Sequence, residues 1–362
     1  MIHKQIYIIF SALLIGLGTI PKQKSPAVHS NSGFVAKEKL SEYGFFMGSM
    51  ADMIPATSVV PYDLNTPLFS NYAKKLRFIQ LPAGQTVTYH PKEVFDFPVG
   101  THIIKTFYYP KDFRDEKKGR ILLETRVLTR TENGWKALEY VWNDEQTEAI
   151  LEVAGGRKEV SWVHTDGTSR KLTYVMPNVN QCKSCHLSDN KLIPIGPSAR
   201  QLNRDFAYAD GKQNQLVQWQ QMGILTGLPA NHQDIPQLAV WDDPSTGDLN
   251  SRARALLDIN CGNCHNTKGS ANTSGLNLDI YEKNPFVWGV YKPPVAAGRG
   301  SGNLSHDIEP GKPEESILLY RMRSTDPGVM MPELGRQLGH EEGIKLVSDW
   351  IKSLKPGDFA KK

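Results

Sequence analysis

The sequence has little of what identifies several common functional classes. Its formal net charge is only +4 over 362 residues, and the charges are spread along the chain, so the composition gives no reason to expect a nucleic-acid partner. It has no paired carboxylates, no Ser-His-Asp order and no phosphate-binding loop, because the glycine-rich segment Gly298–Leu304 follows no predicted strand. These absences leave the cysteines as the main source of chemical information.

Cysteine is scarce too, and all four cysteines fall within two copies of the pattern C-x-x-C-H. The residues of the two copies are Cys182, Cys185, His186, Cys261, Cys264 and His265. A covalent c-type haem needs the whole pattern, because the two thiols bond to the vinyl groups and the adjacent imidazole binds the iron. The sequence therefore predicts two covalently attached haem c groups, with the cysteines as attachment points and the histidines as iron ligands.

Two other chemistries fit the pattern less well. A four-cysteine zinc ribbon separates its C-x-x-C pairs by roughly 15 to 20 residues, whereas 75 residues lie between Cys185 and Cys261. Zinc also does not require a histidine at the same offset twice. A thioredoxin-like dithiol needs one C-x-x-C at the start of a helix, which leaves the second copy unexplained. Haem attachment is therefore the preferred interpretation.

Haem is joined to C-x-x-C-H outside the cytoplasm, and the N-terminus predicts export. The basic segment MIHKQ precedes Ile6–Ile20, an uncharged apolar run of 15 residues. At about 1.5 Å per residue this run is shorter than the roughly 30 Å hydrocarbon core, which favours a signal peptide over residues 1–25. We expect a periplasmic protein. The alternative is an uncleaved segment, which is the only means of membrane association that the sequence offers.

The expected fold class is α+β, with an N-terminal antiparallel β-sandwich-like module followed by a mainly α-helical cytochrome c region carrying two haems. Between about Leu64 and Tyr174, seven short runs rich in β-branched and aromatic residues are separated by turn residues, which indicates strands. Beyond Pro177 short helical patterns interrupt loops rich in Gly, Pro and Asn. The predicted divisions are a β-rich module (40–175), a first haem-binding segment (176–240) and a class I cytochrome c-like domain with the second haem (243–358).

The sixth ligands of the two irons need separate arguments. For the second haem, Met331 in GVMMPELGR precedes the closing helix, and a thioether is the usual partner of His in electron-transfer cytochromes. Met330 and His340 are the alternatives to Met331. For the first haem no comparable segment follows, and the sequence leaves the choice open between no ligand and four residues, which are His164, Met176, His232 and His102. A five-coordinate haem binds small molecules, so an open position would permit catalysis.

Several longer segments resemble a bacterial family of dihaem c-type cytochromes without an established reaction. The segments are PYDLNTPLFSNYAKKLRF, FDFPVGTHIIKTFYYP, LLETRVL, GWKALEYVWN, PNVNQCKSCH, PIGPSARQLNRDF, LDINCGNCHN and MMPELGR. The resemblance runs from about Leu40 to Leu354 and implies two covalent haems and electron transfer in the periplasm. Members of the family often lie near genes for parallel β-helix repeat proteins, which points to a partner, and many are lipoproteins, whereas this chain has no N-terminal cysteine.

Three functions agree with these features. The leading one is an electron carrier with two low-spin haems and a redox partner protein, whose identity the residues do not give. The main alternative is a dihaem oxidoreductase, for example peroxidase-like, in which a Met-ligated haem supplies electrons to an open first haem. The sequence favours the carrier over the catalyst. In the third, the β-rich module docks a partner protein or a glycan through aromatic segments such as FDFPVG and KTFYYPKDF, although aromatic residues in such modules more often form the core.

Overall fold

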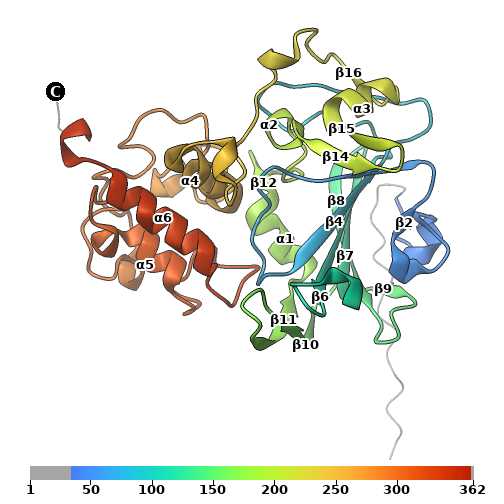
Figure 1. Ribbon diagram of the computed structural model, residues 1–362, viewed down its shortest axis with the longest axis horizontal. Coiled ribbons are helices and arrows are strands. Elements are labelled where there is room, and N and C mark those ends of the chain that lie inside the picture. The colour runs from blue at the N-terminus through green and yellow to red at the C-terminus, as the bar shows by residue number, and fades with distance from the viewer. Residues whose placement is uncertain (1–33, 360–362) are drawn as a thin grey trace, which may run out of the picture. The chain divides into compact units, whose positions relative to one another are not determined.

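The largest element of the structure, a computed structural model that describes residues 34–359, is a six-stranded antiparallel sheet with the strand order β3-β4-β6-β7-β8-β9 (Figure 1). The strands are β3 (Val59–Tyr62), β4 (Lys74–Gln80), β6 (His102–Pro110), β7 (Arg120–Thr131), β8 (Gly134–Trp142) and β9 (Ala149–Leu151). A separate hairpin is formed by β10 (Gly156–Val163) and β11 (Ser169–Met176). All seven predicted runs form strands, because β-branched and aromatic residues pack well on a pleated surface.

One face of the sheet is apolar and packs against the N-terminal part of the described chain. Strand alternation places Phe78, Ile104 and Tyr140 on this face. There they join Leu40 and Phe45 in one buried cluster. The N-terminal segment therefore acts as the cover of this face of the sheet.

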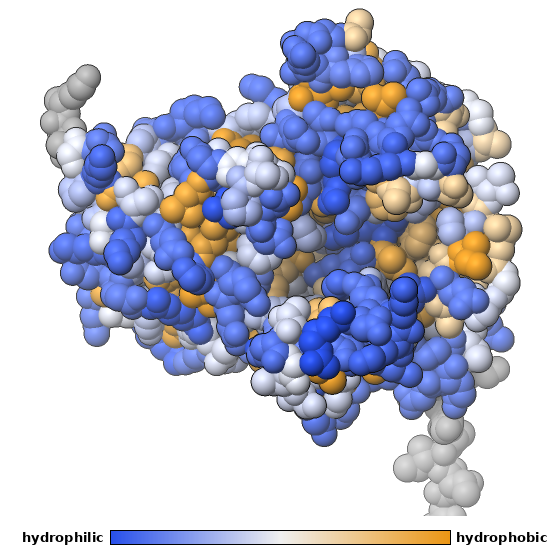
Figure 2. All heavy atoms as spheres, in the orientation of Figure 1, coloured by the Kyte–Doolittle hydropathy of each residue, from blue (hydrophilic) through white to orange (hydrophobic). Residues whose placement is uncertain are grey.

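The outer part of this cover is a small hairpin of β1 (Phe46–Met47) and β2 (Ile54–Pro55). The side chains of Met47 and Ile54, which lie opposite each other in the hairpin, are 49% and 50% exposed. Figure 2 shows a hydrophobic patch over this hairpin on a face that is otherwise mainly hydrophilic. The hairpin thus leaves some apolar surface outside the core.

Short elements follow the sheet in the chain. They are α1 (Val179–His186), α2 (Ala199–Leu202), α3 (Gln215–Gln221), β12 (Leu187–Ser188), β13 (Lys191–Leu192), β14 (Asp205–Tyr208), β15 (Gly211–Asn214) and β16 (Leu225–Thr226). Two of the strand pairs are the hairpins β12–β13 and β14–β15, and β16 pairs in parallel with β5 (Val87–Thr88). These elements lie over the second face of the sheet, where they enclose the site.

This second face is apolar at both ends and charged between them. At one end Ile103 packs with Trp219 of α3 in a buried cluster. At the other end Phe107 packs with Trp162 of the β10–β11 hairpin. The charged side chains between the two clusters face a cavity, because helices and a hairpin, not a second sheet, cover this side.

The aromatic segments that were considered as a docking surface belong to the core. Phe95 and Phe97 of FDFPVG are both 3% exposed, and Phe107, Tyr108 and Tyr109 of KTFYYPKDF are 2%, 7% and 0% exposed. Burial of large aromatic side chains is a main source of core stability, so their position needs no partner to explain it.

The C-terminal region contains α4 (Leu249–Leu257), α5 (Ile317–Arg323) and α6 (Glu341–Ser353), which Figure 1 shows close together. The side chains of all three helices meet in one buried cluster that includes Leu256, Leu319, Val347 and Trp350. The apolar stripe of α6 faces this cluster, in agreement with the amphipathic pattern of EEGIKLVSDWIKSL.

The predicted fold class is wrong. The structure is 28% strand and 25% helix, and residues 243–358 contain three α-helices of 9, 7 and 13 residues joined by long irregular segments. This part is therefore not a mainly α-helical cytochrome c region. Between α4 and α5, Pro285, Pro293 and Pro294 lack the N–H that a helix needs, and Gly289 has a φ of 121°. The sandwich-like module is not formed either, because the strands build one sheet and a separate hairpin.

Two further predictions concern organisation. The signal peptide over residues 1–25 lies outside the described residues. Ala36–Lys362 form one compact unit, and its predicted division into residues 40–175, 176–240 and 243–358 stays a prediction. Within residues 34–359, no helix combines the length and the apolar character that crossing a membrane requires.

Candidate functional site

The first C-x-x-C-H motif lies on α1, and its spacing suits a helix. Residues separated by three and four positions are neighbours on the surface of a helix, so the spacing brings both Cys185 and His186 next to Cys182. The helix begins at a capping box, in which the Asn178 side chain accepts a hydrogen bond from the Gln181 N–H (3.0 Å) and the Gln181 side chain accepts one from the Asn178 N–H (2.9 Å). The cap fixes where the helix starts and thereby which way the motif faces.

The second motif begins where α4 widens into a π-helical turn, Asp258–Gly262. The backbone carbonyl of Cys261 accepts hydrogen bonds from the N–H groups of Cys264 (3.1 Å) and His265 (2.8 Å). The turn therefore closes the motif on itself. Single π-helical turns are rare and occur frequently at functional sites.

Both motifs line one cavity. The cavity volume is about 440 Å³ when only the space open to the centre of a water molecule is counted, and about 2590 Å³ when all space between the lining atoms, including the part open to solvent, is counted. All four cysteines and both motif histidines lie on its wall, together with apolar side chains such as Leu64, Leu68, Leu276, Leu278 and Ile317. A cavity of this size, mainly apolar with a few polar groups, is typical of a cofactor site.

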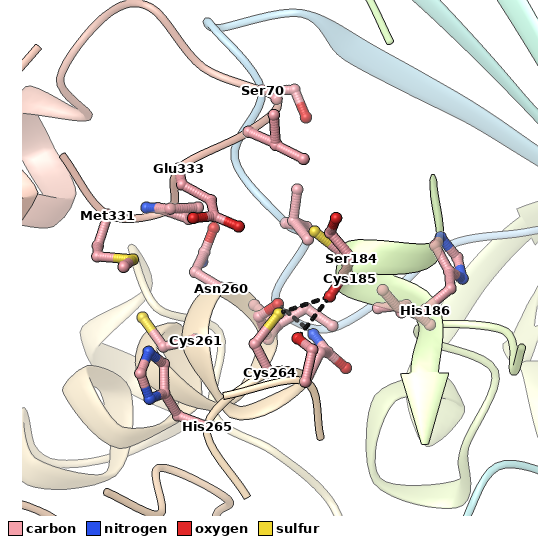
Figure 3. A pocket seen from close by; sticks show the side chains of 18 of the residues that line it. Ser70, Ser184, Cys185, His186, Asn260, Cys261, Cys264, His265, Met331 and Glu333 are labelled. Atoms are coloured by element: carbon pink, nitrogen blue, oxygen red, sulfur yellow. Dashed lines mark hydrogen bonds between the residues drawn. The ribbon is translucent and has the colours of Figure 1, made fainter. Parts of the chain in front are cut away.

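The two motifs are in direct contact. The backbone oxygen of Ser184, inside the first motif, lies 3.4 Å from Cys264 Sγ and accepts a hydrogen bond from Ser270 Oγ at 2.7 Å (Figure 3). The segments that follow the motifs also pair, because the Asp189 N–H donates to the carbonyl of Lys268 at 3.0 Å. Groups attached to the two motifs would therefore be neighbours, although 75 residues separate Cys185 from Cys261 in the chain.

Each motif histidine has one ring nitrogen occupied by a hydrogen bond. His186 Nδ1 lies 2.7 Å from the carbonyl oxygen of Ile193, which can only accept. His265 Nδ1 lies 3.1 Å from Ser274 Oγ, which gives its own hydrogen to the carbonyl of Ala271 at 2.7 Å and so accepts from the ring. Both rings therefore carry the proton on Nδ1 and leave Nε2 free, which is the arrangement of a histidine that binds a metal.

The electrostatic surroundings also favour neutral imidazoles. Burial, followed by the nearby charge of Lys105, lowers the pKa of His186 to about 3. Burial likewise lowers the pKa of His265 to about 4, with smaller contributions from Arg321 and Lys292. Only the neutral ring binds a metal, so at neutral pH neither histidine would have to lose a proton first.

The residues present fit two haem groups better than a zinc ion. Each motif presents two thiols and a neutral imidazole with a free Nε2 to the same mainly apolar cavity. In the described part of the chain, no three His, Cys, Asp or Glu side chains are grouped as ligands of one metal ion. The four cysteines therefore do not converge on a shared zinc site.

Met331 lies on the wall of the cavity, on the same side as Cys261 and His265 (Figure 3). Its backbone is held on both sides, because its N–H donates to the carbonyl of Arg321 (3.0 Å) and its carbonyl accepts from Arg336 Nη2 (2.9 Å). Of the alternatives, Met330 is buried and His340 stacks on an aromatic ring, and neither lines the cavity. Met331 as the sixth ligand stays a prediction.

None of the four residues considered as sixth ligand of the first haem lines the cavity. His164 is buried and accepts a hydrogen bond from Trp162 Nε1 at 3.3 Å. Met176 belongs to the core cluster beneath the β10–β11 hairpin, His102 Nδ1 lies 2.8 Å from Thr129 Oγ1, and His232 is exposed. All four residues therefore lie away from the cavity wall, and the sixth ligand of the first haem stays an open question between these residues and no ligand.

Sequence reasoning missed a group of charged residues on the sheet wall of the cavity. Lys75, Arg77, Lys105 and Arg126 all line it, on three adjacent strands. The charged side chains of a half-buried strand normally face solvent, so Arg126 by itself gave no sign of a cavity. The signal available in the sequence was that KKLRF, HIIKTF and ETRVL carry their cations at positions that coincide when the strands pair.

The site thus consists of two touching C-x-x-C-H motifs, a methionine beside the second and a group of cations beside the first, all on one cavity. Comparison with known proteins gives no matching family model, no matching curated protein and no matching solved structure.

Proposed function

We propose that this chain is a periplasmic dihaem c-type cytochrome that transfers electrons to or from a redox partner protein. The observation that carries the proposal is the convergence of both C-x-x-C-H motifs on one cavity, with the Nδ1 atom of each histidine already occupied. If the C-x-x-C-H motifs served a purpose other than haem attachment, they would not need an imidazole with a free Nε2 beside each pair of thiols.

Each residue of the site has a role in this proposal. Cys182 and Cys185 would hold the first haem, and Cys261 and Cys264 the second. His186 and His265 would be the proximal ligands, and Met331 the sixth ligand of the second iron, where a thioether stabilises the reduced state. When bound, the haems supply one-electron chemistry. The chain itself orients the imidazoles, excludes water with its apolar lining and keeps both attachment points together.

The contact between the motifs supports electron exchange within the protein. Ser184 and Cys264 are 3.4 Å apart and Ser188 pairs with Gly269, so no layer of protein separates the two attachment points. An electron received near one motif would therefore have a short path to the other. A carrier of this kind needs no further catalytic groups, in agreement with the absence of hydrolytic or nucleotide-binding motifs from the sequence.

The proposal is tested by producing the full chain in a bacterium that matures c-type cytochromes and measuring the mass and the haem content of the exported protein. We expect a mass increase of two haems that survives denaturation. The double variants C182A/C185A and C261A/C264A should each retain one haem. A folded, exported protein without covalent haem, or with stoichiometric zinc, would contradict the proposal.

A second candidate function is a dihaem oxidoreductase with an open coordination position at the first haem. It is favoured by the position of His164, Met176, His232 and His102, none of which lines the cavity. The absorption spectrum of the oxidised protein separates the two functions, because a five-coordinate haem gives a high-spin band and two six-coordinate haems do not. Peroxide-dependent oxidation of a reduced cytochrome or dye would then measure the activity.

A further inference from the structure

The cations on the sheet wall of the cavity form a row across three strands. We call Lys75, Arg77, Lys105 and Arg126 the cationic row. Arg77 lies directly opposite Lys105 in the pairing of β4 with β6, and Lys105 lies directly opposite Arg126 in the pairing of β6 with β7. Like charges in directly opposite positions destabilise a sheet, so a row of three needs a compensating charge.

The protein compensates only the two arginines. Arg126 forms a two-point ion pair with the fully buried Glu124, at 2.6 Å and 2.8 Å. Arg77 pairs with Asp63 at 2.6 Å. The remaining members of the row are Lys75 and Lys105, which have no carboxylate partner among the described residues.

The two lysines are held by neutral groups instead. Lys75 Nζ donates to the carbonyl of Leu68 at 2.8 Å. The two ammonium groups lie 5.6 Å and 5.3 Å from the centre of the same ring, that of Phe107. A carbonyl and an aromatic face stabilise a cation much less than a carboxylate does, so both charges remain poorly compensated.

The nearest unused acid does not cancel this charge. Glu139 lies opposite Arg126 in the pairing of β7 with β8, and it is 1% exposed. Neither of its carboxylate oxygens has a hydrogen-bond partner in the described protein. Burial, followed by the charge of Glu124, raises the pKa of Glu139, so the group holds its proton and remains neutral at neutral pH.

The surroundings also act on the lysines themselves. Burial, followed by the charges of Arg126 and Arg77, lowers the pKa of Lys105 to about 7. Burial and the same kind of repulsion lower the pKa of Lys75 well below its usual value. Both lysines line the cavity, and burial and repulsion disfavour their charged form. An anion bound beside them would stabilise that charged form.

We propose that Lys75, Arg77 and Lys105 form a binding site for an oxyanion, a carboxylate or a small inorganic anion, on the cavity wall beside the first C-x-x-C-H motif. Two kinds of anion have this chemistry. One is a propionate group of the first haem, and this form of the proposal rests on the proposed function. The other is a free anion such as nitrite or phosphate, which does not depend on that function. Charge-assisted hydrogen bonds from two ammonium groups and a guanidinium are the usual means of holding such a group.

The first experiment uses free anions. Thermal unfolding of the full chain is followed at increasing concentrations of sodium nitrite or sodium phosphate, with sodium chloride at matched ionic strength as the reference. A bound anion raises Tm in proportion to the logarithm of its concentration. The variant K105M removes the charge but keeps the apolar stem, and it should weaken anion binding about tenfold or more. The control is K74M, on the same strand but the other face of the sheet, which should bind as the wild type does.

The second experiment identifies the haem as the source. Haem content is measured first, so that failure of the proposed function is seen separately from failure of this inference. The reduction potential of the haem that remains in C261A/C264A is then compared with and without K105M. If the propionates occupy the site, free anions have no effect on Tm, and loss of the Lys105 charge lowers this potential, while K74M leaves it unchanged.

The two experiments distinguish a free anion, a haem propionate and no bound anion. An anion-dependent Tm that K105M abolishes assigns the site to a free anion, and a potential lowered by K105M without an anion response assigns it to the haem. A protein that shows neither effect overturns the inference, whether or not it carries haem. If K105M does not fold, K75M gives the same comparison, since it removes the other uncompensated ammonium of the row.

Discussion

The two C-x-x-C-H motifs are identical in pattern and differ in almost everything around them. The first lies on α1, which buries none of its residues and sits over the charged centre of the sheet. The second follows α4, which buries Ala253, Leu256 and Leu257 in an apolar cluster, and Met331 lies on the cavity wall on the same side as this motif. The same motif is thus placed once beside a row of cations with no evident sixth ligand and once beside an apolar cluster with a methionine on the cavity wall.

The difference indicates a division of labour within the proposed cytochrome. Apolar surroundings and a thioether stabilise the reduced state of an iron and keep small molecules away from it, which suits a haem that only carries electrons. Cations beside an unliganded iron attract anions and leave room for them, which suits a haem that binds something. Experiments that change one motif's surroundings and leave the other's unaltered test this division.

The largest expected effect is that of M331A. Removal of the thioether should abolish the sulfur-to-iron charge-transfer band and lower the reduction potential of the second haem, because Met ligation raises it. The first haem should not change. Optical spectra and a redox titration of the wild type and the variant measure both effects.

The matched control for this prediction is M330A. Met330 is 7% exposed but does not line the cavity, so its loss should cost stability as any large-to-small core change does and leave the spectrum intact. A charge-transfer band that survives M331A and disappears in M330A would reverse the assignment. A wild-type protein that lacks the band would instead point to His340, because an imidazole ligand has no sulfur.

The next largest effect concerns the histidine partners, which differ in kind. His265 Nδ1 donates to the Ser274 side chain, whereas His186 Nδ1 donates to the backbone of Ile193. The variant S274A therefore removes the partner of the second histidine alone. A hydrogen bond to Nδ1–H makes the imidazole a stronger donor to the metal, so its loss should raise the potential of the second haem.

The change expected for S274A is smaller than that for M331A, and the first haem is the internal control. The variant S270A removes a neighbouring hydroxyl that bonds to Ser184 and not to a histidine, and it should leave both potentials unchanged. If S274A shifts the first haem instead of the second, the assignment of the two potentials to the two motifs is wrong.

A feature of the fold or of the site could be predicted from the sequence when the residues that indicate it lie close together in the chain. The C-x-x-C-H pattern names its six residues directly, and the strand runs from Lys74 to Met176 alternate strongly enough to be recognised. Met331 was predicted because it lies a few residues before a helix with a clear apolar stripe, and the structure places it on the cavity wall. In each case the residues that carry the signal are close together in the chain.

The features that could not be predicted depend on contacts between segments that are far apart in the sequence. His164 and His102 were considered as ligands because they are histidines, but His102 of β6 contacts Tyr43 and Phe45 on the other face of the sheet, and His164 is buried just after β10. Lys75 and Lys105 were missed because their shared face exists only once β4 pairs with β6. The helical content was overestimated because the long segments that join α4 to α5 and α5 to α6 are irregular. Packing brings the three helices together.

An effect on stability is expected for E139Q, beneath the first motif. The folded protein keeps Glu139 protonated, whereas the unfolded chain releases this proton above the ordinary pKa of about 4.3. The unfolded state therefore binds fewer protons as pH rises, and this residue makes the folded protein less stable between about pH 5 and about pH 8. Each pH unit above the ordinary pKa costs about 1.4 kcal/mol, and glutamine does not titrate, so E139Q should raise the free energy of unfolding by up to about 5 kcal/mol at about pH 8 and by about 1 kcal/mol at about pH 5.

Urea unfolding at the two pH values measures this, and E132Q is the control, since Glu132 is exposed in the turn between β7 and β8. The control should follow the wild type at both pH values. Equal stability of E139Q and wild type at the higher pH would mean that Glu139 is ionised and paired, and the cationic row would then be compensated from within the protein.

The smallest expected effect compares the helix caps of the two motifs. Asn178 caps α1 and Asp248 caps α4, where its side chain accepts a hydrogen bond from the Ser251 N–H at 2.7 Å. Loss of either cap should cost about 1 kcal/mol locally. Because α1 has no buried residues to hold it and α4 has several, N178A in the haem-free chain should speed hydrogen exchange along all of α1, whereas D248A should affect only the first turn of α4. Equal, confined effects would show that α1 is held by packing after all, and that the two motifs differ less in their haem-free state than their surroundings indicate.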